Sequence, residues 1–171
     1  MNKNETLNPN ISDDISNDTR SFVDKILKVN SEFLKSNFQE LQIEDYEYDP
    51  QEASDELGLD IDLVNQLVED YVAQILKTKY QFLELLEELE ETQNISRGCD
   101  YAPFRELAHK NLGVARNLRI LDGIKVLDEL MKKNDLYYLG LCIEALESCA
   151  IRLNPTHAFK TLKLINLKNT F

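Results

Sequence analysis

The chain has 171 residues, of which 43% are hydrophobic and 29% charged, with only 5 Gly and 4 Pro. This length suits one domain plus an extension, and the composition is typical of a helix-rich globular protein. The formal net charge of -12 argues against nucleic acids and anionic membranes as partners, because both would be repelled. No apolar run is long enough to insert in a membrane, and the polar N-terminus does not resemble a signal peptide, so we expect a cytoplasmic protein.

The three cysteines, Cys99, Cys142 and Cys149, do not have the spacing of metal ligands. Cys142 and Cys149 lie two helical turns apart on an apolar face. We therefore expect them to be small buried hydrophobes in a reducing compartment.

The N-terminal part of the chain divides into a tail and a helix. Residues 1–18 are polar and predict a disordered tail. Residues 19–48 predict an N-terminal helix, Ser21 to Leu41, followed by an acidic linker. The helix carries several phenylalanines, which either pack on the rest of the chain or contact a partner. A homodimer through this helix is one of the outcomes left open.

Residues 49–154 carry the pattern of a helical bundle. Pro50 opens a short helix that Gly58 stops. Four helices with apolar stripes follow, at about Asp60–Glu91, Ala102–Leu118, Leu121–Lys133 and Leu136–Leu153. No segment alternates with period two for long, so we predict an all-α fold. The expected architecture is an antiparallel four-helix bundle with a short lid helix and an N-terminal helical extension. Residues 155–171 predict a C-terminal helix and tail, with Thr156 as the helix cap.

The second long helix of this bundle contains a histidine with a glycine one turn later. Its predicted inward stripe consists of Phe104, Ala108, Asn111, Ala115 and Leu118. His109 lies about 100° round the helix from Ala108 and is expected to be exposed. Glycine costs roughly 1 kcal/mol against alanine inside a helix, so Gly113 needs a reason. Access is one such reason, because a missing side chain lets another protein approach His109 closely.

Cationic residues accompany His109 on this helix. Residues four before, four after and seven after it share one side, which places Arg105, Gly113 and Arg116 on one strip, with Lys110 adjacent. Imidazole is a nucleophile that ionises near neutral pH. Charge-assisted hydrogen bonds from these cations would stabilise a phosphoryl group on a ring nitrogen. The alternative is that they are ordinary solvated charges paired with nearby glutamates.

The motif Leu107-Ala108-His109-Lys110, followed by Gly113-Val114-Ala115, resembles the signature of histidine-containing phosphotransfer (HPt) domains. The segment from Asp49 to Leu59 and the helix order after it are also similar to bacterial members of that family. The resemblance covers about residues 49–154.

This resemblance implies that His109 accepts a phosphoryl group from a phosphoaspartate and passes it to another in a two-component phosphorelay. The chain would be a carrier and not a stand-alone enzyme. Its partner would be a response-regulator receiver domain, a histidine kinase or both. It would need no cofactor of its own, because the receiver supplies the Mg²⁺. Gly113 corresponds to the family glycine that lets the receiver dock.

Two positions depart from the family motif. The family has an apolar residue two after the histidine and a lysine three after it, where this chain has Asn111 and Leu112. We expect Asn111 on the bundle seam, where its amide needs hydrogen-bond partners. We expect Leu112 on the exposed flank beside His109, where it would favour apolar docking. Our hypothesis is that Arg105, Lys110 or Arg116 replaces the missing cation. If the site transfers a phosphoryl group, Leu112→Lys should preserve or increase transfer.

Other interpretations remain open at this point. Arg119 stands where many HPt domains have a helix-ending glycine. Together with Asn111 and Leu112, this departure leaves two alternatives, a working carrier or a degenerate relative that binds signalling partners without transfer. Glu106-Leu107-Ala108-His109 also fits the Glu-x-x-His spacing of di-iron bundles. That site needs a second such motif, and the only other histidine, His157, falls outside the bundle. We therefore expect no metal.

Overall fold

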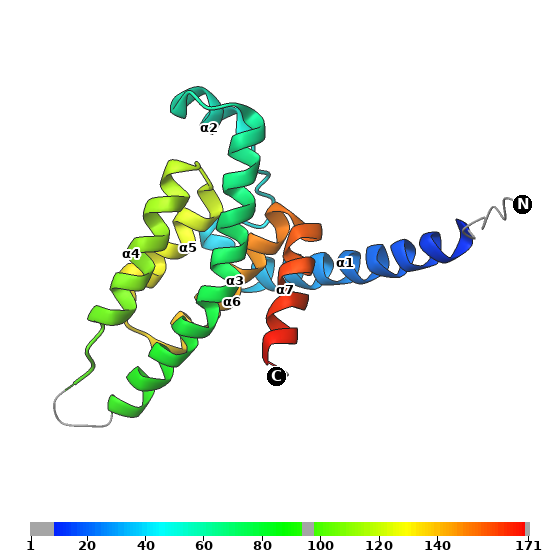
Figure 1. Cartoon of the computed structure of the whole chain (residues 1–171). Coiled ribbons are helices and arrows are strands. Elements are labelled where there is room, and N and C mark those ends of the chain that lie inside the picture. The colour runs from blue at the N-terminus through cyan, green and yellow to red at the C-terminus, as the bar shows by residue number, and fades with distance from the viewer. Residues whose placement is uncertain (1–8, 94–97, 170–171) are drawn as a thin grey trace, which may run out of the picture.

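The computed structural model describes residues 9–93 and 98–169, and all of the regular structure in these residues is helical (Figure 1). The elements are α1 (Pro9–Asn37), the short 3-10 helix η1 (Gln39–Leu41), α2 (Pro50–Leu57), α3 (Ile61–Thr92), α4 (Ala102–Asn117), α5 (Leu121–Lys132), α6 (Leu136–Leu153) and α7 (Pro155–Asn169). The predicted all-α class is confirmed.

The four central helices close a ring of contacts. Helix α3 packs against α4 and α6, and α5 packs against the same two helices. Each contributes fully buried side chains to one apolar core. Phe82 of α3 and Phe104 of α4 meet edge to face, with 5.3 Å between their ring centroids. Asn111, Cys142 and Cys149 are buried as expected. The result is a helical bundle with α4 as one of its walls.

Local sequence signals set the ends of α2. The Asp49 side chain accepts a hydrogen bond from the Gln51 backbone N–H at 2.9 Å, Pro50 occupies the first turn, and Gly58 ends the helix with φ of 65°. Both the proline start and the glycine stop were predicted. Helix α2 packs against α3 at the end of the molecule where α3 begins (Figure 1).

Helix α1 is longer than predicted and packs on the bundle. It begins at Pro9 and not at Ser21, while residues 1–8 lie outside the described part. An existing helix propagates at little cost through polar residues that would not nucleate one, which explains the difference. Helix α1 contacts α6 and α7. Phe38 is buried, and Phe22 meets Phe159 of α7 with 5.4 Å between ring centroids.

Helix α7 is also integrated into the fold. It packs against α3, α6 and α1. Its N-terminal cap differs from the prediction, because Asn154, not Thr156, accepts the hydrogen bond from the His157 backbone N–H, at 3.1 Å. In the part of the chain that the structure describes, no helix combines the length and apolarity that crossing a membrane requires.

Gly123, near the start of α5, permits a close helix approach. A Cβ at this position would lie 2.5 Å from the hydroxyl oxygen of buried Tyr71. We expect Gly123→Ala to destabilise the protein by about 1–3 kcal/mol in urea unfolding, the cost of overpacking a core. Adding Tyr71→Phe removes the clashing oxygen and should recover most of the loss. Gly113→Ala is the matched control, because nothing lies within 4 Å of a Cβ there. Equal effects of the two glycine substitutions would contradict this account.

Candidate functional site

Helix α4 is fixed at both ends by its own sequence. At its start, Asp100 Oδ1 accepts a hydrogen bond from the Ala102 N–H at 3.0 Å. At its end, the Ile120 N–H reaches back to the Ala115 carbonyl at 3.0 Å, and Arg119 adopts a left-handed conformation with φ of 57°. This closing bond satisfies a carbonyl of the last turn. An arginine here costs about 1–2 kcal/mol relative to a relaxed backbone, which is the physical reason a glycine suits this position.

His109 and Gly113 lie on the open side of α4. Both residues are exposed, as predicted from the helix pattern. A Cβ built on Gly113 meets nothing within 4 Å, and the residue lies inside the helix without an unusual backbone conformation. Nothing in the described part of the chain therefore requires glycine at this position.

The two atypical motif positions are both buried. Asn111 is 3% exposed, and its Nδ2 donates to the Leu107 carbonyl at 2.9 Å, so its amide finds a partner within the helix. The prediction that Leu112 is exposed is wrong, since it is also 3% exposed. Leu112 lies one turn after Ala108, and it shares a flank of α4 with Arg105 and Arg116, which both contact α5 or the residue just after it. Leu112→Lys would therefore remove a core side chain, and its effect on stability must be separated from any effect on transfer.

Arg105 donates hydrogen bonds to the C-terminal end of the neighbouring helix α5. Its guanidinium donates to the Leu130 carbonyl, to the Lys133 carbonyl at 2.6 Å and to Asn134 Oδ1 at 2.7 Å, all at the C-terminal end of α5. The cation also lies 4.7 Å from the centroid of the Tyr101 ring. Burial lowers the pKa of Arg105. These bonds occupy the carbonyls at the end of a helix and hold the arginine away from a role at His109.

Arg116 and Lys110 remain accessible beside His109. The Arg116 side chain is 57% exposed, and its Nη2 lies 3.8 Å from Asp128 Oδ1 of α5. Asp128 Oδ2 also lies 3.7 Å from Lys132 Nζ. Ion pairs this exposed contribute little to stability, so an incoming anion can recruit Arg116. Lys110 is exposed on the other side of His109.

An apolar groove of about 490 Å³ runs beside this surface, between α2, α3 and α4. Its apolar lining consists of Leu57, Leu59, Leu67, Tyr71, Val114 and Leu118. Val114 is 43% exposed and Leu57 is 41% exposed. Asn117, one turn after Gly113, also lines the groove, so the groove begins beside the exposed glycine. The sequence did not reveal this groove, because helices separated in the chain form its walls.

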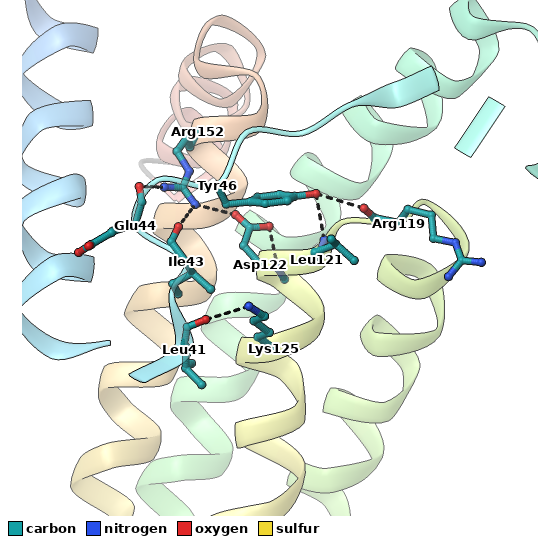
Figure 2. A network of polar contacts seen from close by, with 10 residues as sticks. Leu41, Ile43, Glu44, Tyr46, Arg119, Leu121, Asp122, Lys125 and Arg152 are labelled. Carbon is teal, nitrogen blue, oxygen red and sulfur yellow. Dashed lines mark hydrogen bonds and ion pairs between the residues drawn. The ribbon is translucent and has the colours of Figure 1, made fainter. Parts of the chain in front are cut away.

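The connection between α1 and α2 crosses the end of the bundle where α4 finishes (Figure 2). We call residues 41–48 the strap. Tyr46 Oη donates to the Arg119 carbonyl and accepts from the Leu121 N–H, both at 3.2 Å. Tyr48 Oη donates to the Leu118 carbonyl at 2.7 Å, and burial raises the pKa of Tyr48 to about 12. The strap thus holds the α4–α5 turn, although the sequence indicated only a linker.

A buried ion pair anchors the strap to the bundle. Arg152 Nη2 of α6 lies 2.8 Å from Asp122 Oδ2 of α5, and its guanidinium also donates to the carbonyls of Ile43 and Glu44 (Figure 2). The Asp122 side chain has no exposed surface. Burial raises the pKa of the Asp122 carboxyl, and the Arg152 hydrogen bond opposes that rise.

No group of three or more His, Cys, Asp or Glu side chains in residues 9–93 and 98–169 is arranged to hold a metal ion. Searches against protein-family models, curated proteins and solved structures found no match for this chain.

Proposed function

We propose that this protein is a phosphoryl carrier of the HPt kind, with His109 as the acceptor. The observation that supports this most strongly is Gly113, an exposed glycine inside a helix that no internal contact explains, one turn from an exposed histidine. Glycine is less favourable than alanine in a helix interior by about 1 kcal/mol. A partner protein that packs closely against Gly113 would explain why this residue is a glycine. The adjacent apolar groove offers that partner a surface to bury.

The proposed step is a transfer between a receiver aspartate and His109. A ring nitrogen of His109 attacks the phosphorus of the aspartyl phosphate, the bond from phosphorus to the aspartate oxygen breaks, and a phosphorus–nitrogen bond forms. The aspartate leaves as a carboxylate, and the imidazole releases its N–H proton to solvent. The receiver brings the Mg²⁺ that offsets phosphoryl charge, while Arg116 and Lys110 are the cations that this chain can add. Return to a second receiver reverses these events.

The alternative is a degenerate HPt-like module that binds signalling partners without transfer. Burial of Leu112 favours it, because the position that carries a lysine in the family belongs here to the core. The hydrogen bonds of Arg105 favour the binding module too, because they engage one of the cations that was predicted to replace the missing family lysine.

The deciding experiment is phosphorylation by phosphoramidate and, in parallel, by a phosphorylated receiver. The product is read by intact mass at neutral pH. We expect a single acid-labile phosphoryl adduct on the wild-type chain and its complete loss in His109→Gln. The matched control is His157→Gln, which removes the only other histidine and should leave the adduct intact.

The other outcomes are equally informative. An adduct that survives in His109→Gln would overturn the assignment of the site. A wild-type chain that binds receivers but forms no adduct from either donor would establish the binding module instead.

A further inference from the structure

The charges of this acidic protein are segregated among its helices. Helix α7 contains lysines and no acidic residue, although the chain carries 31 Asp and Glu against 19 Lys and Arg. The last three turns of α3, in contrast, are rich in glutamate and contain no basic residue after Lys79. These helices therefore carry opposite charges.

The outward side of α7 combines charge with an exposed apolar residue. Lys160, Lys163, Leu164 and Lys168 are all exposed on α7, whereas Ala158 and Thr161 are buried, and we call these four exposed residues the basic face. Leu164 is 61% exposed. Lys163 Nζ lies 4.7 Å from the centroid of the Phe159 ring, which keeps its charge on this surface.

The outward side of the last part of α3 is complementary. Tyr80, Leu83, Glu84, Glu87 and Glu91 recur at helical spacing on one side, and we call them the acidic face. Tyr80 is 45% exposed and Leu83 is 36% exposed. The neighbouring Lys79 does not neutralise this face, because it pairs with Glu144 and Glu147 of α6 at 3.1 and 3.0 Å.

The α7 of the same chain does not cover the acidic face. It begins beside Glu69, whose Oε2 lies 4.0 Å from His157 Nδ1, well before Tyr80 on α3. Figure 1 shows α3 and α7 diverging toward their C-terminal ends. The two faces therefore lie apart on one molecule, each with apolar groups and charges of a single sign.

We propose that a second copy of this chain covers both faces, giving a twofold symmetric dimer. The basic face of each protomer packs on the acidic face of its partner, so the two junctions are identical, as a closed twofold arrangement requires. An anionic membrane fits less well, because it would attract the basic face while repelling the rest of the molecule. His109 belongs to neither face, and this inference does not depend on phosphoryl transfer.

Charge reversal on each face gives a sharp test by sedimentation equilibrium. In Lys160→Glu/Lys163→Glu and in Glu84→Lys/Glu87→Lys, like charges meet at both junctions, and we expect each variant to dimerise at least about tenfold more weakly. An equimolar mixture restores opposite charges at both junctions and should dimerise like the wild type. Glu47→Lys/Glu52→Lys is the control for Glu84→Lys/Glu87→Lys, because it makes the same change in net charge on exposed residues outside both faces. Wild-type dimers should weaken between about 0.1 M and about 1 M salt.

Several results would overturn the proposal. These are a monomeric wild type, variants that dimerise normally, a mixture that stays monomeric, or a control that dissociates as the variants do. A wild type that is monomeric but sediments with phosphatidylserine vesicles would replace the dimer with a membrane contact. Circular dichroism of each variant checks that the fold persists.

Discussion

Replacing Arg152 with methionine should lower the free energy of unfolding by about 3–5 kcal/mol, because it leaves the buried Asp122 carboxylate without its charge partner. The substitution also frees the carbonyls of Ile43 and Glu44 and so releases the strap. Urea denaturation at neutral pH measures the loss. Arg116→Met is the matched surface control and should cost less than about 1 kcal/mol, since its ion pair is exposed.

The pH dependence distinguishes an unpaired charge from lost packing. Burial already raises the pKa of Asp122 in the folded protein, so the folded state binds this proton more tightly than the unfolded state. Its contribution to stability is therefore fully present below the ordinary pKa and is lost as the pH rises through the folded pKa. Removing Arg152 raises the folded pKa further, so the variant should regain more stability than the wild type on acidification from neutral pH.

A second substitution completes this test. Adding Asp122→Asn to Arg152→Met removes the buried charge and should recover a large part of the loss at neutral pH. It should also abolish the extra gain on acidification. An Arg152→Met variant that loses less than about 1 kcal/mol, or that shows no change in pH dependence, would show that solvent already stabilises the carboxylate.

Replacing Gly113 with leucine should block the proposed transfer from a receiver while leaving the helix intact. A side chain forced into a closely packed contact costs about 1–3 kcal/mol, which corresponds to roughly a 5- to 150-fold weaker interaction. The chain itself has room for the side chain, because nothing lies within 4 Å of a Cβ at this position. Transfer rates from a phosphorylated receiver, measured with Gly113→Ala as the intermediate size, should fall as the side chain grows.

The small donor provides the internal control. Phosphoramidate needs only the exposed His109 ring, so its reaction with Gly113→Leu should remain close to that of the wild type. Both variants should unfold at or above the wild-type temperature, since helices disfavour glycine. Equal losses with both donors would mean that Gly113 supports the histidine itself, and unchanged transfer from the receiver would mean that no partner approaches this glycine.

The sequence predicted the elements that depend on local periodicity. The bounds of α3 to α6 fall within a residue or two of the predicted ones, because each helix has a long apolar stripe and flanking breakers. Pro50 and Gly58 marked α2 because their effect on the backbone does not depend on the rest of the fold. The start of α1 was missed, since its first residues are polar and have no stripe.

The candidate site could be predicted only in part. The exposure of His109 and Gly113 follows from their angle to Ala108, which the sequence contains. The burial of Leu112 depends on how α5 packs against α4. The apolar stripe in the α4 sequence alone does not predict that packing. The partners of Arg105 lie 25 to 29 residues away, at the end of another helix. Such contacts become visible only when the helices are placed in space.

The strap has a consequence for the order in which the molecule assembles. Its bonds to Leu118 and Arg152 join residues 70 to 109 positions apart, so large loops must close before these bonds form. During synthesis the strap leaves the ribosome long before α6, and the carbonyls of Ile43 and Glu44 stay hydrated until Arg152 is made. The strap should therefore dock last, and in native-state hydrogen exchange its end of the bundle should open before the α3–α6 core.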